Sequence, residues 1–112
     1  MKKDRQSGSP PWTEKELDQL VEEATVDCHD EDEQVGGLFA MIEDKLSIPF
    51  ESLVLGVEVT VASVDLVDSG QIVAICCRGG MRQAISILDL PLPTPPPEGA
   101  EWIEAYRRWL GC

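Results

Sequence analysis

The hydrophobic pattern changes character at Pro49, and this change constrains the fold of the 112-residue chain more than any other feature. Before Pro49, apolar residues recur every three or four positions, which is the period of an amphipathic helix. After it, residues 53–67 are rich in β-branched side chains and partly alternate in polarity, which is typical of a strand. Because proline interrupts an α-helix, we expect helices before this position and strands after it.

Two helices are predicted in the first half of the chain. Thr13 and Glu16 have the spacing of a capping box, and the apolar face behind them predicts a helix over residues 13–25. A second helix is predicted over residues 32–47, whose apolar positions are Val35, Leu38, Phe39, Ile42 and Leu46. Two glycines inside it, Gly36 and Gly37, each cost about 1 kcal/mol relative to alanine. They indicate either close backbone packing or a later helix start.

The second half predicts a small sheet. The first strand covers residues 53–67, with Gly56 marking a bulge or bend, and further strands cover 71–78 and 82–88. Glycine-containing turns at 68–70 and 78–80 separate them. Short strands joined by tight turns predict an antiparallel β-meander or a partly open barrel, of roughly three to five strands. The fold class expected is therefore α+β, with two N-terminal helices, this sheet and a C-terminal helix.

A proline-rich segment joins the sheet to the last predicted helix. Five prolines lie between residues 91 and 97, and they predict an extended, polyproline II connector. The alternative is a ligand for a proline-reading groove. The helix after it carries an aromatic stripe that we expect to dock on the core, formed by Trp102, Ile103, Tyr106, Trp109 and Leu110.

The net charge restricts the partners of the chain. It has 21 acidic and 9 basic residues, a formal charge of −12, while 43% hydrophobic residues suffice for a core. Phosphate backbones and anionic lipids would repel such a surface. We therefore expect no nucleic-acid partner and no membrane partner, and the charge favours cations or basic partners. The alternative reading of the charge is solubility alone.

The termini and cysteines indicate the compartment. No apolar run approaches the ~18 residues of a membrane-spanning helix, and the N-terminus has no apolar core of a secretory signal. Residues 1–11 are interpreted as a disordered lead-in and residues 12–112 as a single domain. The cysteines do not resemble a disulfide framework, which predicts reduced thiols and a cytoplasmic protein; they are Cys28, Cys76, Cys77 and Cys112.

An acidic run is the most informative feature for function. Five acids fall within the seven positions 27–33, namely Asp27, Asp30, Glu31, Asp32 and Glu33. Calcium takes six to eight oxygen ligands, several of them carboxylates, which a short acidic loop can supply. Acids at a helix N-terminus are also favoured by capping and by the helix dipole, although five of them repel one another. The pattern of an EF-hand fails, because Val35 and Met41 stand where it needs glycine and glutamate.

Other chemistry has little support in the sequence. His29 is the single histidine, and it has no nucleophile motif to form a triad with. A zinc site from His29 with Cys28, Cys76 and Cys77 fits no paired ligand spacing. The chain has no phosphate-binding glycine loop, and no carboxylate pair stands out. We therefore predict that the protein is not an enzyme.

Several stretches, taken in order, resemble a known family. They are residues 12–14, 26–34, 54–61, 87–93 and 101–109. Together they are similar to the CcbP family of cyanobacterial calcium-binding proteins, over about residues 12–109. The resemblance implies a small α/β protein that binds calcium through acidic residues outside an EF-hand. It also implies a calcium buffer or signalling component, linked in that family to heterocyst differentiation.

The resemblance directs attention to the segment from Val26 to Gln34. We expect calcium as the cofactor, with the ligands drawn from Asp27, Asp30, Glu31, Asp32 and Glu33. A second, weaker site could use Asp65 and Asp68, although a plain turn role is the better explanation of Asp68. A monomer is expected, with the identity of any protein partner left open. The alternative function is a metal-independent, acidic protein-interaction module.

Overall fold

A computed structural model describes residues 12–111. Three α-helices, four strands and one short 3-10 helix follow one another along the chain; they are α1 (Glu14–Thr25), α2 (Glu31–Lys45), β1 (Phe50–Val54), β2 (Val57–Leu66), β3 (Ile72–Arg78), β4 (Met81–Ser86), η1 (Ile87–Asp89) and α3 (Glu101–Leu110). The predicted α+β class is confirmed, with two helices before the sheet and one after it. The predicted lead-in at residues 1–11 and the thiol of Cys112 lie outside the described residues.

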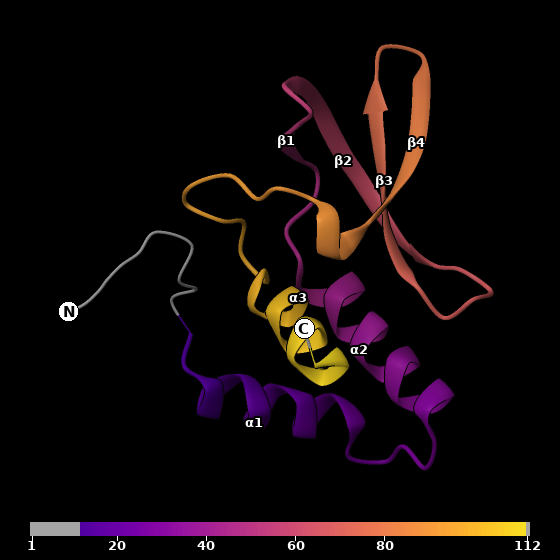
Figure 1. The fold of residues 1–112 in the computed structure, drawn as a ribbon, viewed down its shortest axis with the longest axis vertical. Helices are drawn as coiled ribbons and strands as arrows, with labels where there is room; N and C mark the ends of the chain where they lie inside the picture. The colour runs from indigo at the N-terminus through magenta and orange to yellow at the C-terminus, as the bar shows by residue number, and fades with distance from the viewer. Residues whose placement is uncertain (1–11, 112) are drawn as a thin grey trace.

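The sheet is an open antiparallel meander. Its strands lie in the order β1-β2-β3-β4, and each pairs with its neighbour in the chain. The sheet does not close into a barrel (Figure 1), which decides between the two predicted arrangements. The register of β2 against β3 shifts between Val61 and Ser63, where a bulge interrupts the ladder.

The predicted long strand over 53–67 is wrong, because the chain turns back on itself in its middle. Val54 pairs with Val57, so Leu55 and Gly56 form a two-residue turn between β1 and β2. Both have positive φ, 53° and 78°, as in a type I′ turn. The β-branched run continues on both sides of the turn and hides it, and only Gly56 signals it. The other two turns lie where the sequence predicts them.

The third predicted strand, over 82–88, is also too long. β4 ends at Ser86, and η1 follows as a short 3-10 helix. The Ser86 side-chain oxygen accepts a hydrogen bond from the backbone N–H of Leu88 at 3.3 Å, which caps this turn. The turn places Ile87 in the core, with only 1% of its surface exposed.

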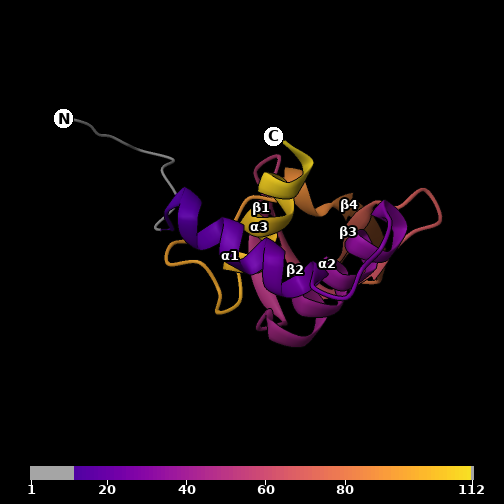
Figure 2. The same cartoon turned by 90° about the horizontal axis from the view of Figure 1, so that it is seen from below.

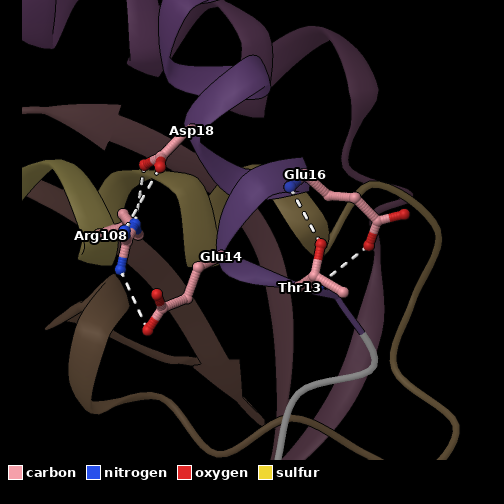
Figure 3. Close-up of polar contacts among 5 residues, drawn as sticks. All are labelled: Thr13, Glu14, Glu16, Asp18 and Arg108. Carbon is pink, nitrogen blue, oxygen red and sulfur yellow. Dashed lines mark hydrogen bonds and ion pairs between the residues drawn. The ribbon is translucent and has the colours of Figure 1, made fainter.

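The first helix begins as its sequence predicts. The backbone N–H of Thr13 donates to Glu16 Oε1 at 2.9 Å, and the N–H of Glu16 donates to Thr13 Oγ1 at 3.1 Å (Figure 3). This reciprocal capping box satisfies two of the free N–H groups of the first turn of α1. The second helix begins at Glu31, one residue earlier than predicted, and ends at Lys45, before Pro49.

The helices lie together at one end of the sheet. Both α1 and α3 pack against α2, and α2 packs against β2 (Figures 1 and 2). The core between these layers is apolar and fully buried around Leu38 and Ile42 of α2, Val61 of β2 and Ile103 of α3. The ends of the strands with the β1–β2 and β3–β4 turns extend away from the helices (Figure 1).

Two glycines allow the helices to pack closely. A Cβ at Gly37 would overlap the backbone carbonyl of Ala24 in α1, whereas a Cβ at Gly36 would meet nothing within 4 Å. The prediction of close backbone packing is therefore confirmed for Gly37 alone. Gly99, with φ of 90°, lies in the same way against the carbonyl of Lys45 at the end of α2. It thereby positions the start of α3.

The aromatic face of α3 docks on the core as predicted. Trp102, Ile103 and Tyr106 are buried. Trp109 is only partly buried, and its indole N–H donates to Gln34 Oε1 in α2 at 2.9 Å. Leu110 departs from the prediction, since 44% of its surface is exposed at the end of the helix.

The proline-rich segment connects the sheet to α3, as the connector interpretation predicts. It forms neither helix nor strand and bends at residues 94–95, so it is not one straight extended segment. Its first part runs beside β1, where the Ser52 hydroxyl donates to the carbonyl of Pro91. This contact ties the start of the segment to β1.

Candidate functional site

The acidic run forms the connection between α1 and α2. Asp27 lies in the turn after α1, Asp30 is the N-cap of α2, and Glu31, Asp32 and Glu33 occupy the first turn of that helix. All five side chains are exposed. In Figure 1 this connection lies at the opposite end of the molecule from the β1–β2 and β3–β4 turns.

Two of the five carboxylates serve the start of α2. Asp30 Oδ1 accepts a hydrogen bond from the backbone N–H of Glu33 at 2.9 Å. Glu33 Oε1 in turn accepts from the backbone N–H of His29 at 2.7 Å. These are the contacts of an N-cap and of a near relative of the capping box, shifted by one residue. The capping explanation is therefore confirmed for Asp30 and Glu33, while Asp27, Glu31 and Asp32 have no such role.

The electrostatic field around the connection is negative. Within residues 12–111, no lysine or arginine forms an ion pair with any of the five carboxylates. The N-terminus of α2 contributes the equivalent of about half a positive charge. This offsets only a small part of five negative charges, so cations are attracted to this end of the molecule.

The donor atoms suit a hard cation, but the arrangement does not form a coordination sphere. Carboxylate and carbonyl oxygens are the ligands that calcium prefers. Among residues 12–111, however, no group of three histidine, cysteine, aspartate or glutamate side chains is arranged to hold a metal ion. The five carboxylates share one connection without converging on one point. An ion could gain several of them as ligands only if their side chains moved.

The zinc alternative is not supported by the positions of its residues. Cys28 and His29 lie in the α1–α2 connection, and the Cys28 thiol donates to the carbonyl of Glu33 at 3.2 Å. Cys76 and Cys77 lie in β3, where Cys76 is buried and Cys77 is half-buried. Burial raises the pKa of the Cys76 thiol, and the neighbouring Cys77 raises it further. Both effects disfavour the thiolate, which is the form of cysteine that ligates a metal.

The candidates for a second site have local roles. Asp65 Oδ1 accepts from the backbone N–H of Leu66 at 2.9 Å. Asp68 lies in the β2–β3 turn, which is closed by a bond from the N–H of Gly70 to the carbonyl of Val67 at 2.8 Å. The turn role of Asp68 thus agrees with the sequence prediction.

A groove that the sequence did not reveal lies at the other end of the sheet. It has a volume of about 520 Å³ and is lined by β1, β2, β3 and β4 near the two hairpin turns. Large apolar side chains are exposed around it, including Leu55 at 98% and Met81 at 77%. The only signal for it is that residues 71–88 contain two arginines and no acid. The hidden β1–β2 turn made it impossible to see which strands would line it.

The comparisons with known proteins leave the family of the chain open. No protein-family model matches it, and neither a curated protein nor a solved structure gives a significant match. Among residues 12–111, no helix combines the length and the hydropathy that crossing a membrane requires.

Proposed function

We propose that the protein is a cytoplasmic calcium-binding protein whose site is the α1–α2 connection. The observation that carries the proposal is the set of five exposed carboxylates with no basic partner within residues 12–111. A divalent cation relieves the repulsion among them. The resemblance to the CcbP family supports the same assignment and the role of a calcium buffer or signalling component.

The arrangement of the carboxylates predicts weak binding. Asp27, Glu31 and Asp32 must come together around an ion, and Asp30 and Glu33 can contribute only through oxygens not used in capping. Ordering exposed side chains costs free energy. We therefore expect a dissociation constant in the weak range of calcium modules, on the order of 10⁻⁴–10⁻³ M.

Calorimetric titration of the full chain with calcium chloride tests the proposal directly. We expect saturable binding that weakens at least fivefold in Asp27→Asn and in Asp32→Asn, because each variant removes one charge without touching a capping bond. Asp30→Ser is the third variant. Because serine caps a helix about as well as aspartate, this substitution removes the charge and keeps the cap. The control is Glu43→Gln, which removes an exposed charge near the far end of the same helix.

The outcomes separate the site from the function. No heat of binding up to about ten times the expected dissociation constant would show that the chain does not bind calcium. Binding that is unchanged in all three loop variants would place the ion elsewhere. Equal weakening in Glu43→Gln would indicate only a general effect of net charge.

The second candidate is a metal-independent, acidic interaction module. It is favoured by the absence, among residues 12–111, of three metal-ligating side chains around one point. A basic peptide that binds the α1–α2 connection equally well with and without a chelator would support it over calcium binding.

A further inference from the structure

An apolar groove crosses the part of the sheet that the helices leave uncovered. Its apolar lining comes from all four strands, and consists of Val54, Val57, Val59, Cys76, Met81 and Ile85. These residues belong to the face of the sheet that, nearer the helices, packs into the core through Val61 and Ala74. The groove is therefore a continuation of the core-facing surface of the sheet beyond the helices.

The free edge of β4 runs beside this groove. Within residues 12–111, no strand pairs with the outer side of β4. A two-residue turn makes Arg78 and Met81 a hydrogen-bonded pair. The backbone groups of Arg82 and Ala84, one and three residues further on, consequently point away from β3. They form a short template for another strand.

The charge of the groove is opposite to that of the rest of the chain. Arg78 and Arg82 line it together with a single acid, Asp89, whereas the whole chain has 21 acids and 9 bases. One N–H of the Arg78 guanidinium donates to the carbonyl of Glu58 at 3.1 Å. This bond holds the Arg78 side chain toward β2, so Arg82, which lies on β4 itself, is the arginine closer to the free edge and offers its donors to a carboxylate.

We propose that this surface binds an extended, acidic peptide segment of another protein by adding it as a fifth strand beside β4. The backbone of the segment would pair with Arg82 and Ala84. Its alternate apolar side chains would lie in the groove, and a carboxylate would meet Arg82, which lies on β4 itself. A second copy of this chain is disfavoured as the occupant, because two molecules of charge −12 repel each other. A short segment with one or two carboxylates is repelled far less.

Panning a phage library of random decapeptides on the full chain tests the proposal. We expect the enriched peptides to share alternating apolar residues with at least one aspartate or glutamate. Synthetic versions added to isotope-labelled protein should shift the amide resonances of β4 and of the two hairpin turns. They should leave those of the α1–α2 connection unchanged, so the result is independent of calcium binding.

Three variants distinguish strand addition from adventitious contact. Ala84→Pro removes an outward N–H without removing a bond to β3, and we expect it to weaken the selected peptides at least tenfold. Arg82→Gln should weaken them about tenfold by removing the carboxylate partner. Lys45→Gln removes an equal charge from an exposed position at the end of α2 and should change the affinity less than twofold. Amide spectra of each variant show that the sheet is intact.

Four results would overturn the proposal. The first is a panning that enriches no peptide on the parent chain. The second is peptides that bind Ala84→Pro as well as the parent chain. The third is a concentration-dependent dimer in sedimentation that Ala84→Pro dissociates, which would make a second copy the occupant. The fourth is a set of enriched peptides without acids whose binding is unaffected in Arg82→Gln.

Discussion

Leu55 has a backbone conformation that leucine rarely adopts. Its φ is 53°, and its side chain is 98% exposed at the tip of the β1–β2 hairpin. A non-glycine residue in the left-handed region costs roughly 1–2 kcal/mol, and asparagine tolerates this region much better. Nothing in the fold compensates for this cost, because the side chain contributes almost no buried area. The exposed leucine is consistent with a role in contact with a partner at the groove.

Replacing Leu55 by asparagine therefore separates stability from binding. We expect Leu55→Asn to raise the free energy of unfolding by about 1 kcal/mol and the melting temperature by about 3–6 °C. The same variant should bind the selected decapeptides more weakly. The control is Leu53→Asn, because Leu53 is also exposed but lies in regular strand. Thermal melts of the two variants, followed by circular dichroism, measure the change in stability. A Leu55→Asn variant that melts below the parent chain would contradict the strain argument.

Arg108 links the C-terminal helix to the first helix. It donates to Asp18 Oδ1 at 2.8 Å and to Oδ2 at 3.3 Å, and it lies 3.6 Å from Glu14 Oε2 (Figure 3). The hydrogen bond from Arg108 lowers the pKa of Asp18 below its ordinary value and outweighs desolvation, which raises the pKa; the charge of Arg108 lowers it further. The ionised carboxylate is therefore preferred in the folded state.

This shift gives the stability a pH dependence with a definite sign. A carboxyl whose pKa is lower in the folded state stabilises the protein above its unfolded pKa, and that contribution is lost as the pH falls through the folded pKa. We expect Asp18→Asn to melt at a lower temperature than the parent chain at pH 6, by a small amount because the pair is exposed. The difference should shrink as the pH falls through the folded-state pKa of Asp18, which lies below its ordinary value. A difference that stays constant with pH would show that the charge of Asp18 does not stabilise the fold.

At the scale of elements, we expect alanine to have opposite effects on stability at the two glycines of α2. Gly36→Ala should stabilise the protein by about 0.5–1 kcal/mol, because alanine favours a helix and its Cβ meets no atom within 4 Å. Gly37→Ala should destabilise it by at least about 2 kcal/mol, because its Cβ would overlap the carbonyl of Ala24 and force α1 away from α2. Urea denaturation of the two variants measures both signs.

The outcome tests whether the α1–α2 packing depends on the glycine itself. If both variants are stabilised, the helices can separate at little cost and the contact between Gly37 and Ala24 is unimportant. If both variants are destabilised, the loss of stability arises from α2 as a whole and not from the contact between Gly37 and Ala24.

The sequence predicts elements well where one residue pattern has one structural explanation. The helix starting at Thr13 follows from its capping box, and the turns at 68–70 and 78–80 follow from their glycines. The β1–β2 turn could not be predicted in the same way, because Leu55 is unusual in a type I′ turn and β-branched residues flank it. η1 was missed because its buried Ile87 continues the apolar pattern of β4.

For the candidate site, the sequence predicts where the acids lie along the chain but not what each of them does. Five acids in one connection are evident from the sequence, but two explanations apply to them. Hydrogen bonds assign capping to Asp30 and Glu33, and no residue pattern could have divided the run between capping and free carboxylates. Which strands meet at the groove likewise depends on tertiary pairing.

At the scale of the whole molecule, charge is distributed between two ends. The α1–α2 connection carries five acids, while the opposite end has the two hairpin turns and the arginines of the groove. Mutual repulsion among the excess acids of a chain with charge −12 destabilises the folded state. Any salt should therefore stabilise the protein through screening, and specific calcium binding must be recognised above this effect.

Melting temperatures in sodium, magnesium and calcium chloride at matched ionic strength make that separation. We expect calcium to raise the melting temperature above the sodium curve and above magnesium, because magnesium demands a rigid octahedral set of ligands that this connection does not hold ready. A ligand at ten times its dissociation constant stabilises the folded state by about 1.4 kcal/mol, or about 4–8 °C here. In the double variant that combines Asp27→Asn and Asp32→Asn, the rise in melting temperature with calcium beyond that with sodium should fall by more than half. The Glu43→Gln variant should retain this rise. Coincident curves for the three salts would mean that screening alone acts on the acidic end, and the metal-independent module would then be the better explanation of its charge.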